Sequence, residues 1–147
     1  MSLPERTDDW PFSYSDRVRF GDLDAMRHLN NVEFLRFFES ARIAYITTLF
    51  PDHEPANGRG WGLIFAEAHV NYRAPAFFDE SIRTYVRPEA VKRSSFRMAF
   101  EMRAEHDGRL LAEGWGALVG YDYAAERAAP LPDEVRESLH AAGRGPA

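Results

Sequence analysis

The fold is decided by one stretch, Phe20-Gly-Asp-Leu-Asp-Ala-Met-Arg-His-Leu-Asn-Asn31, together with the apolar segment that follows it as far as Pro51. The quoted residues place two carboxylates, one imidazole and two amides directly before the apolar segment. From Val32 onward, apolar residues recur at intervals of three and four positions, which is the period of an α-helix. We therefore expect one long helix, preceded by a polar connection that carries more chemistry than any other segment.

Two signals bound this helix. Asn30 is a favoured N-cap residue, and Glu33 three positions later resembles the partner in a capping box. Pro51 ends the helix, because proline cannot donate the backbone hydrogen bond that would continue it. Polar side chains interrupt the helix only sparsely, so we expect it to be largely buried and to fill the core.

Alternating apolar and polar residues predict strands on both sides of the helix. His106-Asp107-Gly108 predicts a hairpin turn, because Asp-Gly supplies the positive φ that a tight turn needs. Three glycines in the last strand indicate a bend or close packing against something large. The expected strands are 14–20, 64–72, 81–87, 96–105 and 109–121, and the three glycines are Gly114, Gly116 and Gly120.

This order of elements predicts an α+β domain in which a five-stranded antiparallel sheet covers one apolar helix. A chain of 147 residues is about the size of one domain, so we expect a single domain over residues 1–147. Its core should span about 14–121, followed by a short C-terminal helix at 132–141 and a disordered tail.

The composition argues against several functional classes. A formal net charge of −5 is the opposite of what a non-specific nucleic-acid binder carries. The chain has no Cys, and its five His are scattered without ligand-like spacing, so we expect neither a metal nor a cofactor. No apolar run approaches the roughly 20 residues that span a bilayer, and the polar start lacks a signal peptide's apolar region. We therefore expect a cytoplasmic protein with no membrane partner.

Two segments resemble the signature of the hotdog-fold acyl-CoA thioesterases of the 4-hydroxybenzoyl-CoA thioesterase family. One is the stretch 21–31 with Phe34-Leu-Arg-Phe-Phe-Glu-Ser-Ala-Arg42, which is similar to the branch that reads Asp-x-x-x-His-x-Asn-Asn. The other is Asn71-Tyr-Arg-Ala-Pro-Ala-Phe-Phe-Asp-Glu80. The resemblance covers about 14–121 and implies a long helix in a curved antiparallel sheet. It also implies hydrolysis of an acyl-CoA, in homodimers or homotetramers whose active sites form across an interface.

By this resemblance Asp24 is the catalytic carboxylate, as a nucleophile or as a general base toward water. His28 would orient that carboxylate or line the thioester site, while Asp22 is a turn residue with a supporting role as the alternative. One of Asn30 and Asn31 should cap the helix, and the other should hold the substrate carbonyl or the attacking water. Unpaired amides near Asn31 would stabilise the oxyanion.

Coenzyme A carries phosphates, which call for cations near the mouth of the site. Lys92, Arg93 and Ser94 resemble the basic turn with which some family members hold the nucleotide end, and the alternative is an ordinary solvated turn. Acyl carrier protein is a second acyl donor, since related plant thioesterases share part of the signature. A hotdog enoyl-CoA hydratase or dehydratase and a non-catalytic acyl-CoA-binding protein remain competing functions. The length and type of the acyl chain depend on pocket depth and cannot be read from the sequence.

Overall fold

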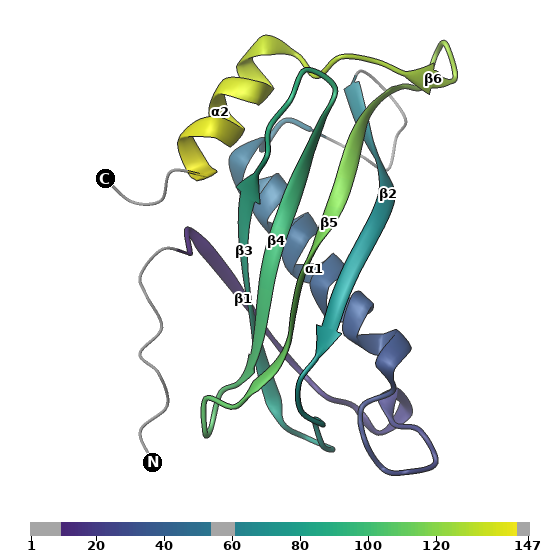
Figure 1. The fold of residues 1–147 in the computed structure, drawn as a ribbon, viewed down its shortest axis with the longest axis vertical. Coiled ribbons are helices and arrows are strands. Elements are labelled where there is room, and N and C mark those ends of the chain that lie inside the picture. Colours follow the sequence, from purple (N-terminus) through teal and green to yellow (C-terminus); the bar gives the residue numbers. More distant parts are fainter. Residues whose placement is uncertain (1–9, 54–60, 144–147) are drawn as a thin grey trace.

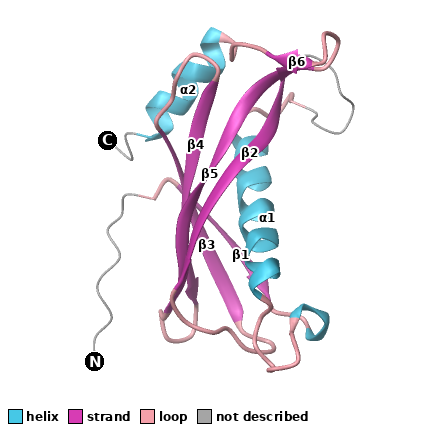
Figure 2. Ribbon diagram, turned by 45° about the vertical axis from the view of Figure 1, so that its right-hand side comes forward, coloured by secondary structure: helices cyan, strands magenta, loops and turns pink. Residues whose placement is uncertain are grey.

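A curved antiparallel sheet lies against one long helix in the computed structural model, which describes residues 10–53 and 61–143 (Figure 1). The strands are β1 (Phe12–Arg17), β2 (Trp61–Tyr72), β3 (Ser81–Glu89), β4 (Ser95–Ala104), β5 (Leu110–Asp122) and β6 (Arg127–Ala128). The helices are the 3-10 turn η1 (Phe20–Asp22), α1 (Asn31–Leu49) and α2 (Asp133–Gly143). Figure 2 shows α1 running along one side of the sheet.

The strands pair in the order β1-β3-β4-β5-β2, with β6 added to β5. Every strand pair is antiparallel, as short connections predict, and β1 and β2 form the two edges of the main sheet. All five expected strands and both expected helices are present. The two-residue β6 was not predicted, because a strand of that length shows no alternation. The expected disordered tail lies largely in 144–147, outside the described residues.

Two predicted boundaries are wrong by three residues, and one of them is the start of β2, which was expected at residue 64 and lies at Trp61. The first strand was expected to run to Phe20, but β1 ends at Arg17 and Phe20 belongs to η1, where it is 79% exposed. The backbone N–H of Arg19 donates to Oδ2 of Asp22 at 2.8 Å, which turns the chain out of the sheet three residues early.

The core forms where α1 meets the sheet. Phe38 of α1 is fully buried and stacks on Phe100 of β4, with ring centroids 4.3 Å apart. The alternation in β4 is confirmed, since every second residue from Phe96 to Ala104 is buried. The buried face of α1 comprises Phe34, Phe37, Phe38, Ala41, Tyr45 and Ile46.

The glycines of β5 allow α1 and β2 to pack closely against this strand, which confirms the expected tight packing. A Cβ at Gly116 would meet the rings of Phe65 at 2.3 Å and Phe38 at 2.8 Å. A Cβ at Gly114 would stand within van der Waals overlap of the backbone carbonyl oxygen of His69 in β2. The pairing of β2 with β5 therefore leaves no room for a side chain at Gly114.

Replacing Gly114 with Ala should lower the free energy of unfolding by about 2 kcal/mol or more, because the new methyl group collides with rigid backbone. Chemical denaturation with urea measures this. Gly21→Ala is the matched control, since nothing lies within 4 Å of a Cβ there and its stability should stay close to that of the wild type. Equal stability of the two variants would show that β2 and β5 do not pair as described.

Candidate active site

Residues 22–30 form a closed loop between η1 and α1, here called the 22–30 loop. Leu23 and Leu29 form an isolated antiparallel bridge, and the backbone N–H of Asp24 donates to the carbonyl oxygen of His28 at 3.0 Å. The N–H of Asn30 donates to the carbonyl oxygen of Asp22 at 2.9 Å. The loop therefore holds Asp24 and His28 opposite one another, at the N-terminal end of α1.

Asp22 anchors this loop to the helix. It is only 5% exposed, and its Oδ2 accepts from the backbone N–H of Arg19. Nη2 of Arg36, in the second turn of α1, lies 2.8 Å from the same oxygen without the alignment of a hydrogen bond, so this contact is an ion pair. Asp22 thus has a supporting role beyond that of an ordinary turn residue.

Arg36 forms ion pairs with carboxylates from three elements. Its Nε donates to Oε2 of Glu33 at 2.7 Å, and its Nη1 lies 3.7 Å from Asp16 of β1. Burial acts to lower the pKa of Arg36, but the hydrogen bond to Glu33 and the charges of Asp22, Glu33 and Asp16 raise it overall. Sequence reasoning placed Arg36 only on the polar side of the helix, because its partners are set by the tertiary fold.

The Asp24 carboxylate accepts a hydrogen bond through one of its two oxygens. Oδ1 accepts from the backbone N–H of Met26 at 2.8 Å, and the turn closes where the N–H of Arg27, at φ 66°, donates to the carbonyl oxygen of Asp24. In the described part of the chain no group bonds to Oδ2. The side chain is partly exposed. One carboxylate oxygen is thus positioned by the loop, and the other is free to act.

The start of α1 offers fewer free amides than the sequence suggested. Asn30 is the N-cap, with its Oδ1 accepting from Val32 at 3.1 Å and its carbonyl oxygen from Glu33 at 2.8 Å. The expected capping box is wrong, because the Glu33 side chain bonds to Arg36 instead. Within residues 10–53 and 61–143, the backbone N–H of Asn31 has no partner. It is the one donor among these first three helical amides that could face an oxyanion.

Tyr72 at the end of β2 supports this helix start, although no pattern in the sequence indicated it. Its hydroxyl donates to the carbonyl oxygen of Asn31 at 3.0 Å, and its ring meets Phe34 edge-on at 5.2 Å. His28 is partly exposed and packs edge-on against Phe77, with ring centroids 5.3 Å apart. The loop therefore lies beside aromatic side chains that come from β2 and the β2–β3 connection.

The structure brings Asp24, His28, Asn30 and Asn31 together, but not the basic turn. Lys92, Arg93 and Ser94 lie between β3 and β4, at the opposite end of the sheet from the 22–30 loop (Figure 1). The turn is packed in place, since the carbonyl oxygen of Ser94 accepts from Gly120 at 2.7 Å. Within one protomer these residues cannot reach the same part of a ligand as Asp24.

The described residues contain no group of three His, Asp or Glu side chains arranged as metal ligands. None of the helices in that same part of the chain is long and apolar enough to cross a bilayer.

Comparisons with known proteins agree on one family. A model of the thioesterase-like superfamily matches residues 18–139. The long-chain acyl-CoA thioesterase FadM of Escherichia coli is 24% identical over 129 residues, which cover 84% of this chain and 92% of that protein. A solved thioesterase from Thermus thermophilus, complexed with coenzyme A and Zn, is 33% identical, with 95% of this chain and 98% of that one covered and a TM-score of 0.81. The hotdog fold expected from the sequence is thereby confirmed.

Substituting Asp22 with Asn should lower the free energy of unfolding by about 2 kcal/mol, because it removes a buried charge that pairs with the partly exposed Arg36. Thermal and urea unfolding measure the change. Asp79→Asn is the matched control, because its ion pair with Arg17 is well exposed, and it should change stability by no more than about 0.5 kcal/mol. A variant of Asp22 as stable as the Asp79 variant would contradict the anchoring role.

Proposed function

The chain belongs to the thioesterase-like superfamily, and we propose from this that it hydrolyses an acyl-CoA to the free acid and coenzyme A with Asp24 as the central carboxylate. The observation that carries the assignment of residues is the geometry of the 22–30 loop. In this loop the backbone N–H of Asp24 bonds to the carbonyl oxygen of His28, one oxygen of the Asp24 carboxylate accepts from Met26, and the loop leads into the helix start at Asn31, which supports the assignment.

Thioester hydrolysis needs a group that attacks or activates water, and a donor that stabilises the oxyanion. As a nucleophile, Asp24 would attack the carbonyl carbon while the C–S bond breaks and coenzyme A leaves as the thiolate. Water would then cleave the mixed anhydride and restore the carboxylate. As a general base, Asp24 would take a proton from a water molecule whose oxygen bonds to the carbonyl carbon. When the C–S bond then breaks, the protonated Asp24 would return that proton to the departing thiolate. Both routes fit the same geometry.

The remaining predicted residues take subsidiary roles in this proposal. The N–H of Asn31 would donate to the developing oxyanion, and His28 would orient the carboxylate or line the thioester site. Asn30 contributes through its cap, which fixes the helix start. Tyr72 would act as a positioning residue, because its hydroxyl holds the carbonyl group of Asn31.

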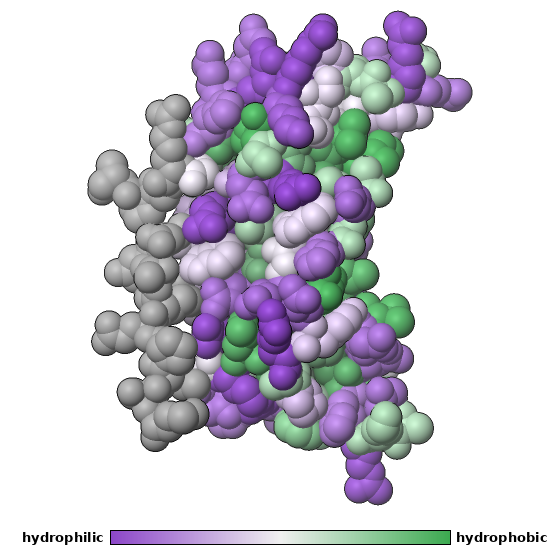
Figure 3. Space-filling view, in the orientation of Figure 1, coloured by the Kyte–Doolittle hydropathy of each residue, from purple (hydrophilic) through white to green (hydrophobic). Residues whose placement is uncertain are grey.

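We also propose a homodimer, formed through the β2 edge of the sheet. Ile64 in β2 is 42% exposed and Ile43 of α1 is 49% exposed. Figure 3 shows hydrophobic side chains along the side of the molecule where β2 and α1 lie. An unpaired edge strand with apolar side chains favours pairing with another strand. A partner protomer could also bring its Lys92 to Ser94 turn to the coenzyme A end of the site, which one protomer alone does not do.

Acyl carrier protein as a second acyl donor, a homotetramer and a cytoplasmic location stay predictions.

Substituting Asp24 with Asn should reduce kcat/KM for an acyl-CoA by about 100-fold or more, because the amide can neither attack nor accept a proton. The release of thiol from a panel of acyl-CoAs measures this. The amide oxygen can still accept from Met26, so the loop should keep its shape. Asp122→Asn is the matched control, since Asp122 also accepts backbone N–H bonds, from Ala124 and Ala125, in a turn at the far end of β5.

Unchanged hydrolysis by the Asp24 variant would rule out its central role. Hydration of an enoyl-CoA by the wild type without any thiol release would instead favour the hydratase alternative.

The dimer can be tested by sedimentation at micromolar protein concentration. We expect the wild type to sediment as a dimer or larger, and Ile64→Lys to sediment as a monomer, because a lysine on an edge strand opposes pairing. Tyr14→Lys is the matched control on the other edge strand, where Tyr14 is exposed to a similar degree, and it should leave the assembly intact. A wild type that sediments as a monomer would contradict the proposal.

A further inference from the structure

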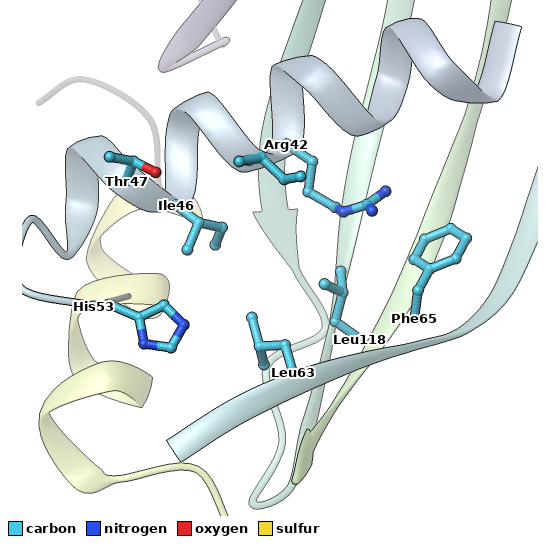
Figure 4. A pocket seen from close by; sticks show the side chains of 8 residues that line it. Arg42, Ile46, Thr47, His53, Leu63, Phe65 and Leu118 are labelled. Carbon is cyan, nitrogen blue, oxygen red and sulfur yellow. The ribbon is translucent and has the colours of Figure 1, made fainter. Parts of the chain in front are cut away.

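A cavity lies between the C-terminal half of α1 and the strands β2 and β5. Its volume is about 170 Å³, and its walls are mostly apolar (Figure 4). Figure 4 shows Arg42 reaching from α1 toward Phe65 along one wall, with Leu63 and Leu118 on the other side. Arg42 lies about three helical turns after Asn31, or about 16 Å along the axis, so the cavity is separate from the 22–30 loop. The proposed hydrolysis makes no use of it.

Arg42 is a buried cation without a hydrogen-bonded anion. Its side chain is only 10% exposed, and its guanidinium lies over the rings of Phe65 and Phe38, 4.4 Å and 5.1 Å from their centroids. The nearest carboxylate oxygen, Oε2 of Glu39, is 3.9 Å from Nη2 and belongs to a side chain that is 60% exposed. In the part of the chain that the structure describes, no group hydrogen-bonds to this guanidinium.

This arrangement is costly unless something compensates the charge. Burial lowers the pKa of Arg42, and the charge of Glu39 offsets only part of that effect. Arginine nevertheless stays protonated in proteins, so the cation persists in its apolar wall. Contacts with two aromatic faces return some of the lost hydration, but no protein oxygen in the described residues accepts a hydrogen bond from this guanidinium. An arginine held in this state is suited to receive an anion from outside the protomer.

We propose that this cavity binds a carboxylate carried on a small apolar body, with Arg42 as the anion-binding group. The planar guanidinium matches a carboxylate, to which it can donate two parallel hydrogen bonds. Ile46, Leu63 and Leu118 would surround the apolar body. An apolar protein cavity of about 150 Å³ accommodates benzene, so a body of about six carbons fits this volume.

His53 lines the same cavity without adding a charge at neutral pH. Burial lowers the pKa of His53, and its ring stacks on Trp61 with centroids 4.0 Å apart. Among the described residues that line the cavity, Arg42 is therefore the one cation at pH 7. The choice between an acid and its neutral isostere should depend on Arg42 alone.

Binding of hexanoate and benzoate, followed by calorimetry or ligand-observed NMR, tests the proposal without any hydrolysis. We expect the wild type to bind these acids at least 10-fold more tightly than hexanamide and benzamide. Arg42→Met, which keeps an unbranched apolar stem but removes the charged guanidinium, should weaken acid binding by at least 10-fold. Arg97→Met is the matched control, because Arg97 also lies over an aromatic ring, 3.8 Å from the centroid of Trp115, but is exposed.

Two results would overturn the proposal. One is equal binding of acid and amide by the wild type, which holds whether or not the Arg42 variant folds. The other is a wild type that does not bind the acids, combined with an Arg42→Met variant whose assembly dissociates. That pair of results would show that Arg42 pairs with a carboxylate of a partner protomer.

The carboxylate could come from a free acid or from the far end of an acyl chain, and kinetics separates these sources. The second source rests on the proposed hydrolysis. If it holds, the monothioester of a dicarboxylic acid should be cleaved at least 10-fold more efficiently than a neutral acyl-CoA of the same length, and Arg42→Met should abolish that preference. Equal efficiencies assign the cavity to free acids. If no thioester is cleaved, the proposed function fails, while the hexanoate measurement still shows whether the cavity binds a carboxylate.

Discussion

The geometry of the 22–30 loop depends on the ion pair between Asp22 and Arg36. Asp22 is buried at the point where β1 gives way to the loop, and its one oxygen serves both the backbone of Arg19 and the guanidinium of Arg36. Because Arg36 belongs to the second turn of α1, the pair joins the loop to the largest element of the core. The backbone bonds from Asp24 and Asn30 then close the loop on that anchor. The position of the Asp24 carboxylate therefore depends on an ion pair that does not include Asp24 itself.

The same helix end serves architecture and chemistry, and the two needs compete for its amides. Asn30 accepts the N–H groups of Val32 and Glu33 with its side chain and its carbonyl oxygen, so among the first three helical amides in the described chain the proposed oxyanion donor is that of Asn31. A single well-placed donor can still contribute on the order of 3 kcal/mol to transition-state stabilisation. Tyr72 holds Asn31 from the other side through its carbonyl oxygen. Hydrogen bonds thus fix both the carbonyl group of Asn31 and one oxygen of Asp24.

The sequence predicted the kind and order of the elements well, because those depend on local patterns. The alternation of β4, the Asn30 cap and the Asp-Gly turn each act over a few residues and survive in the fold. What it missed depends largely on contacts between distant segments, and the bond between Glu33 and Arg36, three positions apart, is the local exception. Glu33 bonds to Arg36 rather than closing a capping box, and Asp22 proves to be an anchor only when the helix packs beside it. The distance between Asp24 and the Lys92 turn is likewise a property of the folded sheet. The lack of a hydrogen-bonded carboxylate at Arg42 could not be foreseen, because it requires knowing how the carboxylates nearby are oriented.

The central claim is that the 22–30 loop presents Asp24 to the thioester carbon and the amide of Asn31 to its oxygen. It is tested most directly by the crystal structure of the protein with a ketone analogue of an acyl-CoA, in which a methylene group separates the sulfur from the carbonyl and prevents hydrolysis. The account predicts the carbonyl carbon beside the free Oδ2 of Asp24 and the carbonyl oxygen within hydrogen-bonding distance of the N–H of Asn31. An analogue bound with its carbonyl group away from the 22–30 loop would contradict it.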